Sequence, residues 1–333
     1  MKQYLVILLD DTSTSYCQYH NTRVTPRLIP IDYLQRGILW AMKENLMIQC
    51  ILPSYKLPTD YIDAINAIDH HLIVPSNCED SSAIEAADII VFNQWEDSHN
   101  LKLDSEKSYI LRTSKDDLFK QFNLITDILP SLFRLNITIT DVACFTDEDC
   151  KKYKSVLDEL INTIEQEYVN DHPVQLNILT DRIMLTTMNN CGAGDTCITL
   201  APDGKFYPCP AFYYAQPCDS NETSLGDICA KGYDIGSIDN GLLIHNQRLY
   251  KLDSAPLCRK CDAYQCKRCV WLNRKLTFEL NTPSHQQCIV AHLERNASRE
   301  LLQRIRAHGS FLPDHSDIPE ISYLDPFEVR DKY

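Results

Sequence analysis

Eight cysteines in the second half of the chain have the side-chain type and the spacing of metal ligands. Their pattern is C-x5-C-x11-C, a gap of 48 residues, C-x2-C-x4-C-x2-C, and a last cysteine after 18 more residues. A C-x2-C pair lets two thiolates reach one metal centre, because a short turn brings both to the same side. Eight thiolates divide naturally into two four-ligand sites, drawn from Cys191, Cys197, Cys209, Cys258, Cys261, Cys266, Cys269 and Cys288.

Three interpretations of this pattern compete. Incidental free cysteines are often buried and inert, but they do not explain two C-x2-C pairs within twelve residues. Two structural zinc sites are an alternative, although zinc ribbons commonly separate their pairs by about 15–20 residues, and only four residues separate Cys261 from Cys266. Two iron–sulfur clusters are favoured, because tight cysteine runs in two-cluster ferredoxins send one cysteine to the other cluster.

Basic side chains crowd the second cysteine run. Between residues 258 and 275 the only acid is Asp262, and the cations are Arg259, Lys260, Lys267, Arg268, Arg274 and Lys275. A metal centre held by four thiolates is negative, and nearby cations offset that charge. Zinc with four thiolates is also negative, so this feature does not select the metal, and a solvated basic face remains the simple alternative.

The elements that must position these cysteines follow an α/β pattern. Strands are predicted at 3–10, 48–52, 71–75, 88–93, 109–113, 134–141 and 175–180, mostly as continuous apolar runs, which is typical of strands covered on both faces. Helices are predicted at 31–44, 59–68, 115–128 and 147–168. This alternation indicates parallel β/α units with right-handed crossovers. An open or partial β/α barrel and a doubly wound sheet both remain possible.

Cysteine and glycine usage changes near residue 190. Five cysteines lie in 1–190 and ten in 191–288, and Gly37 is the only glycine before Gly192. We therefore expect a β/α domain at 1–188, a Cys-rich domain at 189–308 and an extended tail at 309–333. Within the second domain a hairpin is predicted at 198–208, turning at Pro202-Asp203-Gly204, and a helix at 286–307.

Composition excludes several classes of protein. The 333 residues include 46 acidic and 32 basic side chains, for a net charge of −14, and 44% are hydrophobic. The hydrophobic content is typical of a globular protein. The negative net charge argues against wholesale binding of nucleic acid or anionic lipid. No apolar run approaches the roughly 18–20 residues of a membrane helix, and the N-terminal apolar stretch indicates a core strand rather than a signal peptide. We therefore expect a cytoplasmic protein whose cysteines bind metal or act in redox chemistry.

The cysteine region resembles a SPASM domain. The resemblance is carried by Cys191-Gly192-Ala193-Gly194, by the run from Pro202 to Cys209, and by the later cysteine run, which is one residue shorter than the usual C-x2-C-x5-C-x3-C in each of its last two gaps. SPASM domains follow the catalytic barrel of many radical SAM peptide-modifying enzymes and hold two auxiliary [4Fe-4S] clusters. The resemblance implies cluster I on Cys191, Cys197, Cys209 and Cys269, and cluster II on Cys258, Cys261, Cys266 and Cys288, with Cys218 and Cys229 outside the pattern.

The motif of the radical SAM catalytic cluster is absent. That cluster needs C-x3-C-x2-C in the loop after the first strand, but here residues 10–23 contain only Cys17, and the chain has no Gly-Gly pair. The first domain therefore resembles a degenerate radical SAM barrel without its catalytic cluster and without an S-adenosylmethionine site. Cys17 and His20 form either a C-x2-H half-site or an ordinary loop. Asp10 and Asp11 are either functional groups or loop caps.

The whole chain resembles the CXXX repeat peptide maturase family, through the phrase from Cys261 to Asn273. The resemblance implies an accessory maturase with a Cys-rich precursor peptide and a separate radical SAM maturase as partners. Its clusters would relay electrons or dock the peptide. One alternative is a non-redox peptide-binding scaffold in which clusters or zinc only stabilise the fold. Another is a stand-alone peptide-modifying enzyme with a site near residues 10–20. The sequence leaves open whether the chain is itself catalytic.

Overall fold

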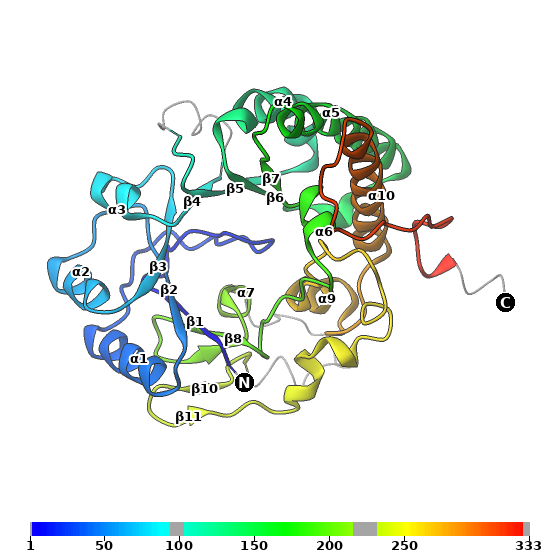
Figure 1. The fold of residues 1–333 in the computed structure, drawn as a ribbon. Helices are drawn as coiled ribbons and strands as arrows, with labels where there is room; N and C mark the ends of the chain where they lie inside the picture. The colour runs from blue at the N-terminus through cyan, green and yellow to red at the C-terminus, as the bar shows by residue number, and fades with distance from the viewer. Residues whose placement is uncertain (1, 94–102, 216–231, 329–333) are drawn as a thin grey trace. The chain divides into compact units, whose positions relative to one another are not determined.

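The computed structural model describes residues 2–93, 103–215 and 232–328, and the chain divides into two compact units (Figure 1). The first unit is Met1–Val91 with Gly192–Ser254, and the second is Phe92–Cys191 with Ala255–Tyr333. Each unit thus joins segments from both sides of residue 188, so the predicted division at that residue remains a prediction.

Parallel strands build the core of the first unit. Residues Leu5 to Leu9 are fully buried, as the continuous apolar run predicts. In Figure 1 the helices that connect the strands lie on their outer side. The elements are β1 (Tyr4–Leu8), α1 (Ile31–Lys43), β2 (Met47–Ile51), α2 (Thr59–Asn66), β3 (His70–Pro75), α3 (Ser81–Ala86) and β4 (Ile89–Phe92), with consecutive strands paired in parallel.

A strand from the later sequence completes this layer. β8 (Cys197–Leu200) pairs in parallel with β1 and forms a hairpin with β9 (Phe206–Tyr207), which confirms the predicted hairpin. Its turn contains Gly204 at φ 76°, a conformation that favours glycine. Gly37 on α1 faces this strand, and a Cβ there would overlap the Leu200 side chain. The unit ends with α7 (Pro210–Tyr214), β10 (Gly236–Ser237) and β11 (Gly241–Leu242).

The second unit combines three parallel strands with long helices. Its elements are β5 (Ser108–Thr113), α4 (Lys115–Ile128), β6 (Arg134–Ile139), α5 (Asp147–Val169), β7 (Gln175–Leu176), α6 (Thr180–Met184), α9 (Val270–Thr277) and α10 (His285–Ala307). Short 3-10 turns lie at Leu129–Ser131 and Val142–Cys144 in this unit, and at Gln247–Tyr250 and Leu252–Ser254 in the first.

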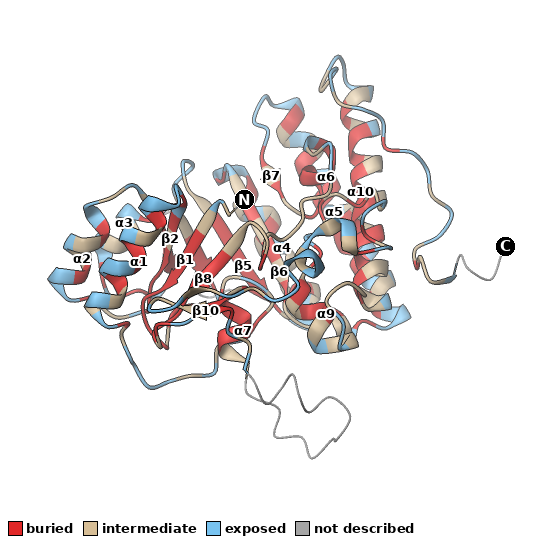
Figure 2. Ribbon diagram, turned by 90° about the horizontal axis from the view of Figure 1, so that it is seen from below, coloured by how far each residue is buried: buried red, intermediate tan, exposed pale blue. Residues whose placement is uncertain are grey.

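Helices α5 and α10, of 23 residues each, pack against each other through buried faces (Figure 2). α5 begins with a capping box in which Thr146 and Asp149 exchange hydrogen bonds. The Tyr153 hydroxyl of α5 donates to Glu294 Oε1 of α10 at 2.8 Å, between two buried side chains. This pairing gives α10 a rigid support, and α10 carries part of the cysteine site.

The predicted α/β class with parallel β/α units is confirmed, and every predicted strand and helix has a counterpart. The last predicted strand is shorter than expected. Thr180 Oγ1 accepts from the Leu176 backbone N–H and donates to its carbonyl, so the chain turns into α6. Among the described residues, no helix has the length and apolar character needed to span a membrane.

Candidate metal centre

Four of the eight predicted ligands surround one cavity in the second unit. The cavity has a volume of about 310 Å³ and is lined by Cys258, Cys261, Cys266 and Cys288. The first three lie in the irregular segment before α9, and Cys288 lies in the first turns of α10. Within the described ranges, no three His, Cys, Asp or Glu side chains are close enough to hold a single metal ion. The four thiols therefore line a space rather than converge on a point.

Local hydrogen bonds explain how the sequence places these thiols. The Cys261 N–H donates to the Cys258 carbonyl, and the Cys266 N–H donates to the Ala263 carbonyl, both at 3.0 Å. These tight turns are the geometry expected for closely spaced ligands. On α10, Ser284 caps the helix by accepting from the Gln287 N–H, which fixes the turn that carries Cys288.

Burial controls the ionisation of all four thiols. It raises the pKa of Cys258 to about 11 and that of Cys266 to about 12, and it also raises the pKa of Cys261 and Cys288. The neighbouring thiols raise the pKa of Cys288 further. Without a bound cation the site is therefore protonated at neutral pH, and metal binding would release protons.

A buried guanidinium lies beside these thiols. Arg268 is 1% exposed, and it donates from Nε to Asn190 Oδ1 at 2.8 Å and from Nη1 to Asn281 Oδ1 at 2.7 Å. Both of these acceptors are neutral. The Arg268 charge lowers the pKa of Cys258, against the larger effect of burial. The backbone φ of Arg268 is 27°, a value that non-glycine residues rarely adopt, so the surrounding structure must hold the backbone at this residue.

The histidine His292 was not among the predicted ligands, yet it lines the same cavity. Its Nε2 lies 3.5 Å from Cys261 Sγ, and its Nδ1 hydrogen-bonds the Leu324 carbonyl. Because a carbonyl oxygen can only accept a hydrogen bond, Nδ1 carries the proton. Burial also lowers the pKa of the His292 ring, so the ring is neutral and Nε2 is unprotonated. The sequence signal is Cys288-x3-His292, because residues four apart share one face of a helix.

The segment after α10 closes one side of the cavity. Residues 308–327 form no helix or strand, and side-chain contacts hold them. Asp325 pairs with His285 at 2.7 Å, and Phe327 stacks on the same ring with centroids 4.2 Å apart. Ile321, Tyr323 and Pro326 line the cavity.

The ligands predicted for cluster I belong to both units, so the structure describes them only in pairs. In the second unit, the Cys191 N–H donates to the Lys267 carbonyl at 2.9 Å, and Cys269 caps α9 by accepting from the Leu272 N–H at 3.4 Å. In the first unit, Cys197 and Cys209 both lie near the Tyr16 phenol, whose pKa is raised mainly by burial. Cys218 and Cys229 lie outside the described residues.

The loop after β1 is held by polar contacts. Asp11 accepts from Arg23 Nη1 at 3.0 Å, from Arg27 Nε at 2.9 Å and from the Tyr213 hydroxyl. Arg23 also stacks on the Tyr213 ring at 4.1 Å from its centroid. Through these contacts Asp11 holds the loop after β1 in its conformation.

The remaining candidates in this loop have simpler surroundings. Asp10 is fully buried and accepts from the Thr12 N–H at 2.7 Å and from its hydroxyl, which is the geometry of a loop cap. Cys17 and His20 are both exposed.

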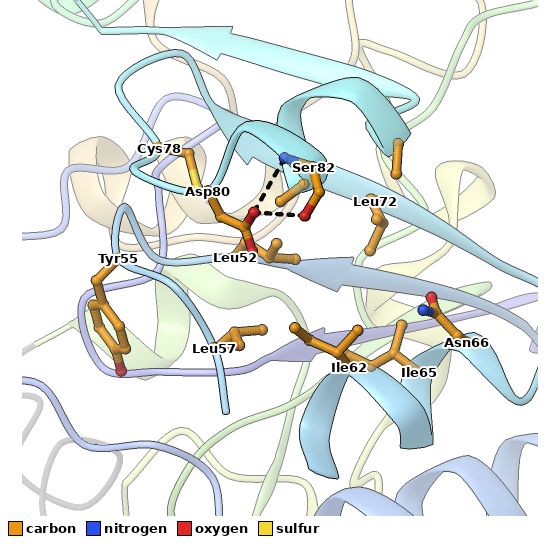
Figure 3. Close-up of a pocket in the computed structure, with 12 residues that line it drawn as sticks. Leu52, Tyr55, Leu57, Ile62, Ile65, Asn66, Leu72, Cys78, Asp80 and Ser82 are labelled. Atoms are coloured by element: carbon orange, nitrogen blue, oxygen red, sulfur yellow. Dashed lines mark hydrogen bonds between the residues drawn. The ribbon is translucent and has the colours of Figure 1, made fainter. Parts of the chain in front are cut away.

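A second cavity, of about 250 Å³, lies in the first unit between β3, α2 and α3 (Figure 3). Its walls are mainly apolar, including Leu57, Ile65 and Leu72. Asp80 caps α3 by accepting from the Ser82 N–H at 3.1 Å. Cys78 is the thiol in this wall, and none of the predicted site residues lines the cavity.

Comparison with known proteins identifies the fold. No family model and no curated protein matches the sequence. Among solved structures, native anSMEcpe with bound AdoMet and Cp18Cys peptide has a TM-score of 0.60 at 12% identity, and covers 92% of this chain and 100% of its own. A polyhistidine-tagged anSMEcpe with bound AdoMet also reaches 0.60, at 11% identity, covering 94% and 98%.

This likeness extends over nearly the whole of both chains, and it confirms the predicted radical SAM-like α/β fold. What the likeness defines is the fold, which is similar to that of anSMEcpe. At this level of identity the likeness concerns architecture, so the chemistry of the chain must be argued from its own residues.

Proposed function

We propose that the chain is an accessory peptide maturase that binds two [4Fe-4S] clusters and works with a separate radical SAM enzyme. The observation that carries the proposal is the group of four cysteines that line one cavity, in a chain that lacks the C-x3-C-x2-C motif. The cysteines around the cavity support a metal centre. The missing motif means that the chain lacks the ligands of the radical SAM catalytic cluster.

Four cysteines of the second unit line one cavity of about 310 Å³, which supports a single four-thiolate site there. Cys258, Cys261, Cys266 and Cys288 would hold the cluster, which would supply one-electron chemistry. The charge of Arg268 favours the thiolate of Cys258, and the carbonyl of Leu324 orients His292 beside Cys261. Cys191, Cys197, Cys209 and Cys269 remain the proposed ligands of cluster I.

The loop after β1 supports an accessory role. Its fold depends on Asp11, Arg23 and Tyr213, and it has only one cysteine. The chain itself would therefore not cleave S-adenosylmethionine, and a partner would supply radical chemistry. We further propose that the substrate of the pair is a Cys-rich CXXX repeat peptide, that the pair acts in the cytoplasm, and that the clusters relay electrons or dock the peptide.

The experiment is a cleavage assay with anaerobically reconstituted protein. We expect no 5′-deoxyadenosine above background from S-adenosylmethionine and dithionite with this chain alone, and modification of a CXXX repeat peptide only when the partner maturase is added. Sustained formation of 5′-deoxyadenosine by the isolated chain would contradict the proposal.

A second candidate is a non-redox peptide-binding scaffold in which clusters or zinc only staple the fold. The contacts of residues 318–328 with α10 favour the scaffold interpretation, because they hold the C-terminal segment against the cysteine site. In that case variants that change the cluster potential but keep the iron would leave peptide maturation unchanged.

A further inference from the structure

The cations around the second cysteine run divide into an inner and an outer set. Arg268 belongs to the inner set, since it is buried and lines the cysteine cavity. The outer set is exposed and consists of Arg259, Lys260, Lys267 and Lys275. None of these four forms an ion pair within the part of the chain that the structure describes.

The nearest acid in the sequence does not neutralise the outer cations. Asp262 lies between the cysteines, but it accepts from Arg295 Nη2 at 2.6 Å and from Arg182 Nη2 at 3.4 Å. Arg295 is completely buried, so Asp262 is committed to the interior. Asp262 is therefore paired with these two guanidinium groups and not with the outer cations.

The position of the outer cations is tied to the thiols. Arg259 and Lys260 lie between Cys258 and Cys261, and Lys267 directly follows Cys266. Lys260 also lines the cysteine cavity itself. A partner that pairs with these side chains is thus brought within a few residues of the proposed cluster ligands.

The charge of this surface is opposite to that of the rest of the molecule. The chain carries a net charge of −14, yet residues 258–275 hold six cations and one acid. An acidic protein would be repelled by most of the surface and attracted here. Such complementarity raises association rates and orients the encounter.

We propose that the outer cations Arg259, Lys260, Lys267 and Lys275 form the docking surface for an acidic one-electron carrier protein. The inference rests on the proposed function, because the carrier would pass one electron to the cluster of the second unit. The carrier is oxidised by one electron and the cluster is reduced by one, with no bond formed or broken. Redox encounters need only small interfaces, which suits a surface of four exposed side chains, of which Lys260 lines the cysteine cavity.

The test compares two fourfold variants of the full-length, anaerobically reconstituted protein. The first carries Arg259→Gln, Lys260→Gln, Lys267→Gln and Lys275→Gln. The matched control removes the same charge from exposed lysines of α4 and α5 through Lys120→Gln, Lys151→Gln, Lys152→Gln and Lys154→Gln. The probe is an acidic plant-type [2Fe-2S] ferredoxin, with its affinity and the rate of cluster reduction measured at low and high salt.

We expect the wild type and the control to bind ferredoxin with strong salt dependence. The first variant should bind at least about tenfold more weakly and lose most of that dependence, while its iron, sulfide and dithionite-reduced EPR spectrum stay unchanged. Equal ferredoxin binding by the two variants, or no binding by the wild type, would overturn the proposal. Unchanged ferredoxin binding with weaker binding of a labelled polyglutamate peptide would assign the surface to a peptide instead. Absence of iron and sulfide in the wild type would refute the proposed function separately.

Discussion

At the scale of single residues, the interior of the second unit contains an unusual carboxyl group. Glu294 is buried, and its oxygens accept from the Tyr153 hydroxyl at 2.8 Å and from Gln265 Nε2 at 3.4 Å. Burial raises the pKa of Glu294 to about 7, although both hydrogen bonds act in the opposite direction. The neutral acid therefore links α5, α10 and the cysteine segment.

This shift predicts a pH-dependent stability. Because the folded pKa is above the unfolded value, Glu294 stabilises the fold fully below about pH 4.5, and this contribution is lost as pH rises to about 7. The loss is on the order of 3 kcal/mol. Glu294→Gln should flatten the dependence, measured as the free energy of unfolding of the metal-free protein at pH 5 and 8. An unchanged pH slope in the variant would show that Glu294 is not the group responsible.

The residues of the site differ in how far the sequence could predict them. The resemblance to a SPASM domain implied the four cysteines that line one cavity in the structure, and short turns fix the relative positions of the three that precede α9. His292 carried a weaker signal, its helical spacing from Cys288 within the predicted helix at 286–307. The buried state of Arg268 could not be predicted, because its acceptors Asn190 and Asn281 come from distant segments.

At the scale of elements, the start of α5 has a direct test. Thr146 Oγ1 accepts from the Asp149 N–H at 3.2 Å and satisfies a backbone donor that the helix leaves free. Thr146→Ala should lower the free energy of unfolding by about 1 kcal/mol. Thr163→Ala, at a partly exposed position in the interior of the same helix, is the control and should cost less. Equal losses in urea denaturation would contradict the capping role.

Regular elements were predicted well where burial and local chemistry agree. The helix predicted at 115–128 has these bounds in the structure, because Ser114 caps it by accepting from the Asp117 N–H. The short helix α3 was not predicted, since its six residues bury no side chain fully and leave no periodic pattern. Local signals therefore define long elements, and short ones depend on tertiary contacts.

At the scale of the whole molecule, the order of segments in the sequence does not reveal which segments form each compact unit. β8 comes after residue 190 but pairs with β1 over four registered residue pairs, from Tyr4 with Cys197 to Ile7 with Leu200. A sequence pattern gives the type of each strand but not its neighbour in the sheet. Composition therefore indicated a change at residue 190, while the compact units cross it.

This pairing predicts that residues 1–188 do not fold alone. Without β8, the fully buried β1 would expose a long apolar edge. The fragment should aggregate or lack cooperative unfolding, as followed by size-exclusion chromatography and near-UV circular dichroism beside the full chain. A monomeric fragment with a sharp transition would contradict the interleaved assembly.

The central claim, that the cysteines hold two [4Fe-4S] clusters, is tested most directly by iron, zinc and acid-labile sulfide per chain after purification without oxygen. We predict about eight iron and eight sulfide in the wild type, and about half of each in Cys266→Ser. Cys78→Ser, which alters a buried thiol of the first unit, should keep the full content. About two zinc with no sulfide in the wild type would contradict the account and leave the peptide-binding scaffold as its replacement.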